Sequence, residues 1–226
     1  MTAIESLLAQ HPVFASLEQK DLAALGALSS SRQFRKGEFV IQQGDIWPTL
    51  FLVTEGRVVA QKASAEGRSL TVTRLETGDL FWGLAFFQEE LAMPVTLEAV
   101  EATRLYLWAQ ADLLPFLVQH GQVSWELSRL MVQRMAQASD MIETLAFQPV
   151  AGRLARFLAE LAPADNSPVA RSLTLDEMAA QVGSTREVVC RFLQRFANDG
   201  LINITRTEFV INSPDGLKEI ARQGKG

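Results

Sequence analysis

Residues 173–193 decide the fold, and they read LTLDEMAAQVGSTREVVCRFL. Thr174 is a favourable helix N-cap, and Glu177 three residues later completes a capping box. Gly183 then supplies a tight turn, and the hydroxyl side chains that follow it can cap a second helix. The segment therefore predicts a helix-turn-helix.

The two predicted helices pack through apolar side chains at helical spacing. These side chains are Met178, Ala179 and Val182 in the first helix and Val188, Val189, Phe192 and Leu193 in the second. Ala179 is small, so the second helix can approach the first closely. Ser184 or Thr185 is expected to cap the second helix.

Three charged side chains, Arg186, Glu187 and Arg191, occupy the surface left exposed at the start of the second helix. In a helix-turn-helix this surface enters the major groove of DNA. An arginine can donate two hydrogen bonds to guanine, and a glutamate can accept one from cytosine. These three residues are therefore the candidate base-reading residues.

Phosphate contacts and a wing complete the prediction. Beyond the helices, residues 201–204 and 209–211 read as two short strands around a turn that carries Arg206, which is expected near a phosphate. One alternative is a helical hairpin with a solvated charged face, but the cap, turn, charge pattern and wing together favour DNA. A second alternative is a β-roll sensor module whose C-terminal helices bind a protein partner. The hydroxyl side chains expected to contact phosphates at the helix starts are Thr174, Ser184 and Thr185.

The preceding part of the chain changes in character from helical to β-rich. Residues 3–30 have roughly helical apolar spacing, with Pro12 breaking the run. Short β-rich runs separated by glycine turns follow as far as residue 107, and they predict an antiparallel barrel or roll. These runs are residues 39–41, 50–53, 58–60, 70–72 and 103–107.

A long helix is predicted over residues 122–147, followed by a second over residues 150–161. The long helix has an apolar stripe close to a heptad repeat, which favours a parallel coiled-coil partner and a homodimer. Packing on its own domain is the alternative. Under the dimer interpretation, charged residues at Leu127 and Leu130 are expected to split the dimer. The stripe consists of Val123, Leu127, Leu130, Met131, Met135, Ala138, Met141, Ile142 and Leu145.

Composition places the chain among soluble proteins. It has 226 residues, 48% of them hydrophobic, and a single cysteine, so no internal disulfide is expected. There is no apolar run of membrane-spanning length, and residues 1–5 show no basic start of a secretory signal. These features predict a cytoplasmic protein with no membrane partner.

The net charge of −5 at first argues against nucleic acid. Residues 149–226, however, carry ten Lys and Arg against nine Asp and Glu, so the acidic excess lies upstream. A DNA-binding surface needs only local positive charge. An enzyme is not expected, because the sequence lacks a phosphate-binding glycine loop, a metal-ligand cluster and a Ser/His/Asp signature.

The run Thr185-Arg186-Glu187, with Arg191, resembles the recognition helix of the CRP/FNR family of transcription regulators. The glycine-punctuated β-rich region resembles that family's cyclic-nucleotide-binding roll, and the long helix resembles its dimerisation helix. Nearly the whole chain is covered. The resemblance implies an α+β fold with three parts: an antiparallel sensor roll in residues 1–121, a dimerisation helix in residues 122–147 and a winged helix-turn-helix in residues 148–226.

The same resemblance implies an effector-controlled homodimer on a palindromic operator of double-stranded DNA, with RNA polymerase as a further partner. The order of Arg186, Glu187 and Arg191 implies half-sites with a G-T-G-A-like core.

The sensor roll departs from the nucleotide-binding members of the family. Those members carry Gly-Glu-Leu, whose glutamate holds the ribose, and then Arg-Ser, whose arginine holds the cyclic phosphate. Here residues 83–85 read Gly-Leu-Ala, and Met93-Pro94 stand where the pair belongs. An unpaired buried phosphate is costly, so cyclic AMP is not expected. The N-terminal cysteines that hold an iron–sulfur cluster in FNR-like members are also absent.

Apolar side chains fill the predicted effector pocket, and three interpretations stay open: an apolar ligand, haem, or a collapsed core. Haem needs an axial ligand, for which His11 is the candidate because some haem-dependent relatives carry histidine near this region. Cys190 is interpreted as a small packing residue rather than a redox switch. The pocket residues are Phe81, Trp82, Leu84, Phe86, Phe87, Met93 and Pro94.

Overall fold

The computed structural model describes residues 2–163, 167–170, 173–205 and 208–223. The chain divides into two compact units, one formed by Met1–Lys62 with Val72–Ala136 and the other by Ala63–Thr71 with Gln137–Gly226. The division falls inside one continuous helix, α4 (Gly121–Phe147). Each unit has its own hydrophobic core and is described by itself.

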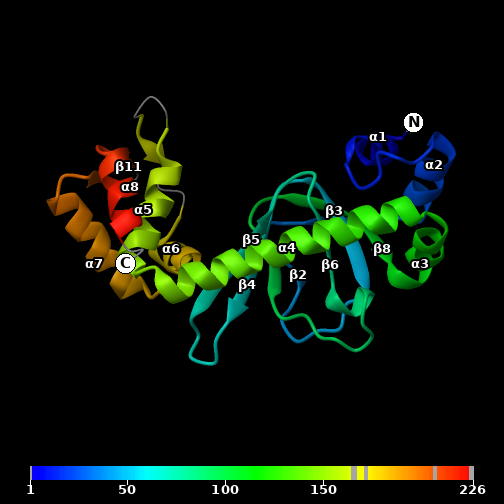
Figure 1. Cartoon of the computed structure of the whole chain (residues 1–226), viewed down its shortest axis with the longest axis horizontal. Helices are drawn as coiled ribbons and strands as arrows, with labels where there is room; N and C mark the ends of the chain where they lie inside the picture. Colours follow the sequence, from blue (N-terminus) through cyan, green and yellow to red (C-terminus); the bar gives the residue numbers. More distant parts are fainter. Residues whose placement is uncertain (1, 164–166, 171–172, 206–207, 224–226) are drawn as a thin grey trace. The chain divides into compact units, whose positions relative to one another are not determined.

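The first unit contains the predicted antiparallel roll, built from two four-stranded sheets of order β1-β8-β3-β6 and β2-β7-β4-β5 (Figure 1). The central pair is β3 with β8, whose register runs from Thr49 opposite Ala109 to Glu55 opposite Arg104. The strands are β1 (Ser30–Phe34), β2 (Phe39–Ile41), β3 (Thr49–Glu55), β4 (Val58–Ala63), β5 (Ser69–Leu75), β6 (Leu80–Trp82), β7 (Thr96–Ala99) and β8 (Thr103–Ala109).

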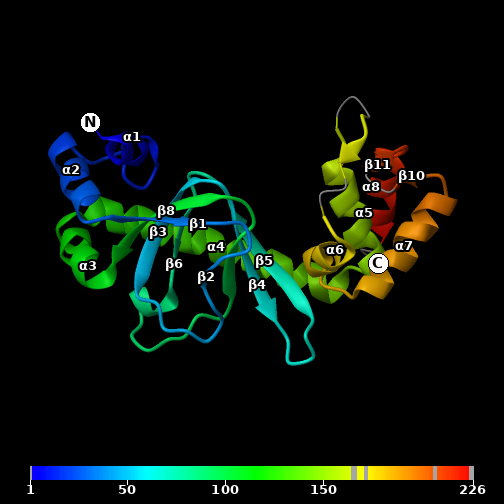
Figure 2. The ribbon, with the colours of Figure 1, turned by 180° about the vertical axis from the view of Figure 1, so that it is seen from behind.

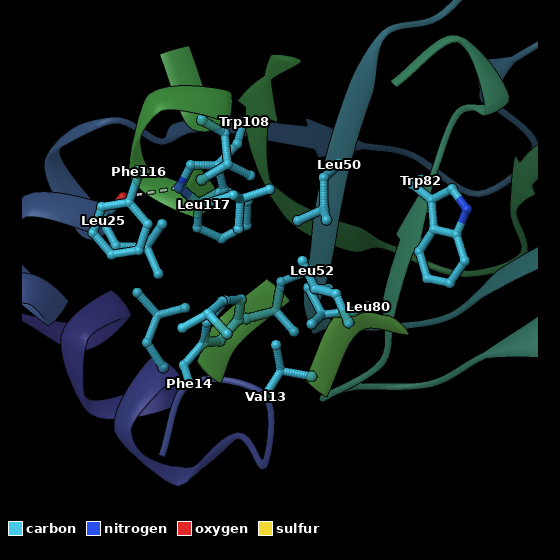
Figure 3. Packing of buried hydrophobic residues seen from close by; sticks show 14 of the residues in the cluster. Val13, Phe14, Leu25, Leu50, Leu52, Leu80, Trp82, Trp108, Phe116 and Leu117 are labelled. Atoms are coloured by element: carbon cyan, nitrogen blue, oxygen red, sulfur yellow. Dashed lines mark hydrogen bonds between the residues drawn. The ribbon is translucent and has the colours of Figure 1, made fainter. Parts of the chain in front are cut away.

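Strand β3 separates two cores, because successive side chains of a strand point to opposite faces. Leu50 and Leu52 pack in a core shared with helices α1 (Ala3–Gln10), α2 (Gln19–Ala27), α3 (Gln110–Gln119) and the start of α4. Figure 3 shows this helix-side core, in which the Trp108 indole N–H donates to the Leu25 carbonyl at 2.8 Å. Phe51 and Val53 pack in the second core, inside the roll.

Residues 3–30 form the two helices α1 and α2, separated around the break predicted at Pro12, and β1 begins at Ser30. One prediction for this unit is corrected. Leu127 and Leu130 lie on the side of α4 that packs within its own unit: Leu127 is 2% exposed in the helix-side core, and Leu130 packs against that core. Their substitution would test folding rather than dimerisation.

The second unit is a winged helix-turn-helix, as predicted (Figure 2). Its core joins apolar side chains of all four helices to a three-stranded sheet of order β10-β11-β9. Strands β10 and β11 pair antiparallel, with Ile202 opposite Ile211, and form the predicted wing. Arg206 lies outside the described residues. The elements are α5 (Val150–Leu161), β9 (Val169–Ala170), α6 (Leu175–Val182), α7 (Arg186–Asn198), β10 (Ile202–Ile204), β11 (Glu208–Ile211) and α8 (Pro214–Gln223).

In the described part of the chain, no helix combines the length and apolar character that a membrane span needs. Over the same residues, no group of three or more His, Cys, Asp or Glu side chains is placed to hold a metal ion.

Candidate nucleic-acid interface

The start of α6 is fixed by the predicted capping box. The Glu177 N–H donates to the Thr174 hydroxyl at 3.2 Å, and the Thr174 N–H donates to the Glu177 carboxylate at 2.6 Å. These bonds satisfy main-chain donors that have no partner inside the helix. The Thr174 hydroxyl also donates to Glu177 at 2.8 Å, so a phosphate contact by Thr174 requires its hydroxyl to leave this carboxylate.

The turn between the helices depends on Gly183. Its backbone is left-handed, with φ 61° and ψ 51°. A Cβ atom there would lie 2.7 Å from a methyl carbon of Leu145. The next residue, Ser184, donates its N–H to the Ala179 carbonyl at 2.9 Å and closes the turn. The left-handed backbone therefore favours glycine here, and a Cβ atom would in addition require the Leu145 side chain to shift.

Helix α7 begins after Thr185, whose hydroxyl accepts from the Val188 N–H at 3.4 Å. Its inner side buries Val189, Leu193 and Phe196 in the core of the second unit. The two predicted caps and most of the predicted inward residues are confirmed. Val188 and Phe192 are only half-buried, and Phe196 replaces them at the centre of the core.

Arg186, Glu187 and Arg191 are exposed on the outer side of α7, and we call these three residues the reading face. Glu187 and Arg191 are four residues apart, which places them on the same side of the helix. Cys190 has a free thiol and is half-buried beside them. The structure therefore brings together the three residues that the sequence predicted as base readers.

The reading face is charged in the unbound protein. The pKa of Glu187 is lowered by its own backbone N–H and by the Thr185 hydroxyl, with Arg186 adding to the effect, so its carboxylate is ionised and can accept hydrogen bonds. Arg186 pairs with Asp176 of α6 at 3.3 Å, with both side chains more than half exposed. The Arg191 guanidinium lies 5.9 Å from the ring centre of Phe192.

The pair between Arg186 and Asp176 was not predicted, and the sequence carries no signal for it beyond charge. Since the pair is exposed, it contributes little to stability. It does hold a carboxylate beside the arginine that is expected to read a base. Asp176 therefore competes for Arg186, and it would repel DNA phosphates that approach the start of α7.

The seven predicted effector-pocket residues are distributed over two cores and the surface. Trp82 and Phe86 belong to the helix-side core, whereas Met93 lies inside the roll with Phe81 packed against that core. Phe87 and Pro94 are exposed, and Leu84 is half-buried. Aromatic rings join the two cores: Phe81 stacks on Trp82 at 5.7 Å, and Trp82 meets Phe87 edge-on at 6.0 Å.

Leu84 and Met93 stand where other members carry the groups that hold ribose and phosphate. Leu84 is half-buried and apolar, and it follows Gly83, which lies directly against the Trp47 carbonyl and has no room for a Cβ atom. Met93 is 2% exposed, and its main chain bonds to Gly44 and Asp45 at 2.8 Å each. Its thioether side chain offers a cyclic phosphate no charge.

His11 already uses one ring nitrogen within the protein. Its Nδ1 accepts from the Val13 N–H at 3.2 Å. Burial lowers the pKa of His11, while Asp79 and the Gly78 backbone oppose that shift. Axial ligation of haem iron through Nδ1 would require this hydrogen bond to break, and haem with His11 as its ligand stays a prediction.

Family models match both units of the chain. A cyclic nucleotide-binding domain matches residues 31–120, and a Crp-like helix-turn-helix domain matches residues 152–220. The transcriptional regulator SdrP of Thermus thermophilus is 30% identical over 202 residues, which cover 85% of this chain and 95% of that protein. The chain belongs to the CRP/FNR family.

Other CRP/FNR relatives match this chain in sequence or fold along nearly its whole length. A CRP-like cAMP-activated global transcriptional regulator of Mycobacterium tuberculosis is 26% identical, with 97% of this chain and 100% of that protein covered. The structure of a CRP/FNR-family regulator from Eubacterium rectale has the same fold, with a TM-score of 0.79 at 24% identity over 93% of this chain and 98% of that one. This CRP/FNR member is therefore a DNA-binding transcription regulator and not an enzyme.

In this CRP/FNR regulator, Asp176→Asn is expected to strengthen binding to random DNA more than binding to the preferred site. The carboxylate no longer repels phosphates, and Arg186 is free to contact them. The specificity ratio should fall about two- to fivefold, as suits an exposed ion pair. Titration of the preferred site and of random DNA at one salt concentration measures this ratio. The control is Asp199→Asn, which frees Arg195 at the far end of α7. Equal effects of the two variants would show that Asp176 has no special role.

Proposed function

We propose that the chain acts as a homodimer that binds a palindromic operator, with α7 of each protomer in the major groove. The observation that carries this proposal is an exposed apolar stripe along α4. Trp125, Val132, Met135 and Ile142 are 62%, 64%, 72% and 68% exposed. Apolar side chains of this size rarely remain in water along a helix without a partner surface.

The spacing of the stripe fits a second copy of the same helix. Trp125 and Val132 are seven residues apart, as are Met135 and Ile142. Met135 lies three residues after Val132, so the two pairs take the a and d positions of one heptad register. The opposite side of α4 is occupied, because Val123 and Leu127 are buried in its own unit. One side of α4 thus packs within the protomer and the other is available to a partner helix.

A dimer of this kind determines the form of the operator. Two recognition helices in such a dimer lie about 34 Å apart, so half-site centres should be about 10–11 base pairs apart. The order of Arg186, Glu187 and Arg191 supports half-sites with a G-T-G-A-like core. RNA polymerase is the protein partner expected at a promoter for a transcription regulator.

In vitro selection from random DNA with the full chain tests the proposal. We expect enriched sites with inverted symmetry, and light scattering should give the mass of a dimer. Binding should weaken steeply with salt, because phosphate contacts release counterions. Enriched sites without inverted symmetry would contradict the proposed dimeric reader. A shallow salt slope would favour a module whose C-terminal helices bind a protein.

We also propose that cyclic AMP is not the effector, although several relatives are named as cAMP-activated. The support is the absence of a cation at Met93 and of a carboxylate at Leu84 to meet phosphate and ribose. Calorimetry should therefore detect no micromolar binding of cyclic AMP. The double substitution Met93→Arg with Pro94→Ser tests whether the rest of the roll still accepts the nucleotide. Micromolar affinity in the unmodified protein would overturn this proposal.

A further inference from the structure

We propose that Arg153 is a positioning residue that fixes the start of α7 relative to the last turns of α4, and thereby sets the spacing between half-sites that the dimer accepts. This inference rests on the proposed dimeric function. All the contacts that carry it lie within the second unit.

The Arg153 side chain joins the end of α4 to the turn after α6, which lies about 30 residues beyond Arg153 in the chain. It lies in the first turn of α5, and its guanidinium is half-buried. Towards α4 it donates to the carbonyls of Gln148 at 2.6 Å and Leu145 at 3.3 Å. Towards the helix-turn-helix it donates to the carbonyls of Val182 at 2.8 Å and Gly183 at 3.2 Å.

These four acceptors have a common electrostatic character. The last carbonyls of a helix have no partner inside it and carry the negative end of the helix dipole. Arg153 meets such carbonyls at the ends of both α4 and α6. Burial lowers the pKa of Arg153, but a guanidinium still stays charged at neutral pH. One cation therefore binds the ends of two helices together.

Side-chain packing brings the same two segments together independently of Arg153. The space where Gly183 would carry a Cβ atom is occupied by a methyl group of Leu145, at 2.7 Å. Two residues after Gly183, Thr185 caps α7, and Arg186 and Glu187 follow immediately. The first turn of α7, which holds most of the reading face, is thus placed by contacts with the last turns of α4.

Arginine suits this junction better than lysine does. A guanidinium presents five N–H donors in a fixed fork, whereas an ammonium presents three donors from a single point. A lysine at position 153 keeps the charge but cannot reach carbonyls on both sides in the same arrangement. Arg153→Lys should therefore loosen the junction without leaving a buried charge unpaired.

A loosened junction has a specific consequence for an α4-linked dimer. The distance between the two reading faces becomes less well defined. Operators with a longer or shorter spacer should therefore lose less affinity relative to the best spacer. Base preference within each half-site depends on Arg186, Glu187 and Arg191 and should stay unchanged. If Arg153 had only a structural role, Arg153→Lys would lower the melting temperature of the protein and leave its spacer preference unchanged.

The test compares the unmodified protein, Arg153→Lys and the control Arg156→Lys, which makes the same change three residues further along α5. Each is titrated with the selected operator and with versions whose spacer is one or two base pairs longer or shorter. We expect the affinity ratio between best and altered spacers to fall about tenfold in Arg153→Lys only, as for the loss of charge-assisted hydrogen bonds. Half-site base preference should match the unmodified protein.

An Arg153→Lys protein with unmodified spacer preference would overturn the positioning role alone. An unmodified protein without spacer preference would contradict the proposed dimeric function, and the positioning role with it. If Arg153→Lys does not fold, Leu145→Ala loosens the same junction from the α4 side, and the same broadening is expected. Unmodified spacer preference in Leu145→Ala would then overturn the inference.

Discussion

Met135→Glu combined with Ile142→Glu is expected to convert the protein into monomers and to weaken binding to the palindromic site by about 100-fold or more. In a symmetric dimer these changes place four carboxylates in one apolar seam. A monomer contacts the operator with only one reading face. The affinity loss is large because linking two binding modules raises affinity about 10²–10⁴-fold. Light scattering measures the mass, and titration measures the affinity.

The control for this double variant adds the same charges elsewhere on α4. Gln133→Glu with Gln137→Glu places two carboxylates at exposed positions outside the stripe. That protein should remain a dimer with nearly unchanged affinity. If the Met135 and Ile142 variant also remained a dimer at micromolar concentration, the exposed stripe would not be the interface. The proposed dimer through α4 would then be wrong.

The exposed apolar stripe of α4 shows what hydrophobic periodicity in the sequence can predict and what it cannot. The repeat in residues 122–147 correctly predicted one long helix, with its apolar residues read as a single stripe. It did not separate the side that packs inside the protomer from the side that stays exposed. Leu127 and Met135 read alike as apolar residues at helical spacing, yet one is 2% exposed and the other 72%. Only tertiary packing distinguishes them.

Five strands of the roll were predicted from short β-rich runs, and β1, β6 and β7 were missed, although β6 and β7 are mostly buried. β3 reads as an unbroken apolar run because both of its faces are buried. β1 was missed because its sequence is Ser-Ser-Arg-Gln-Phe and four of its five residues are exposed. It is a strand through its main-chain pairing with β8, which leaves no apolar pattern in the sequence.

Two helices were missed for local reasons. α3 contains Pro115 in its interior, and a proline there usually argues against a helix. α8 follows the wing and has few apolar residues, although Pro214 at its first position is a recognised start signal. Its Leu217 and Ala221, four residues apart, are both buried. Those two signals together would have been enough to predict it.

The helix-turn-helix itself was predictable because its signals are local. Thr174, Glu177 and Gly183 act on neighbours within a few residues, so their roles can be read from spacing. The pair between Asp176 and Arg186 joins residues ten apart on two helices, and the bonds from Arg153 to the turn span about 30 residues. Their formation depends on how α5, α6 and α7 pack, which residue spacing alone does not give.

Arg186→Ala is expected to relax the preference at one guanine of each half-site by roughly 5- to 100-fold, the value of one bidentate arginine–guanine contact of about 1–3 kcal/mol. Arg186 is exposed, with Asp176 as its recorded ion-pair partner, so its truncation leaves the core of the unit intact. Binding to random DNA should change much less, because a base contact contributes little there.

Selection from random DNA, repeated with the Arg186→Ala protein, measures this loss position by position. Arg195→Ala is the matched control, since Arg195 is an exposed arginine of the same helix that lies nine residues beyond the reading position and pairs with Asp199 at 3.8 Å. It removes the same charge and should leave the selected motif unchanged. An Arg186→Ala protein that selects the same motif with the same strength would show that Arg186 does not read a base, and the operator would then have to be recognised by other residues of α7 or through the shape of the DNA.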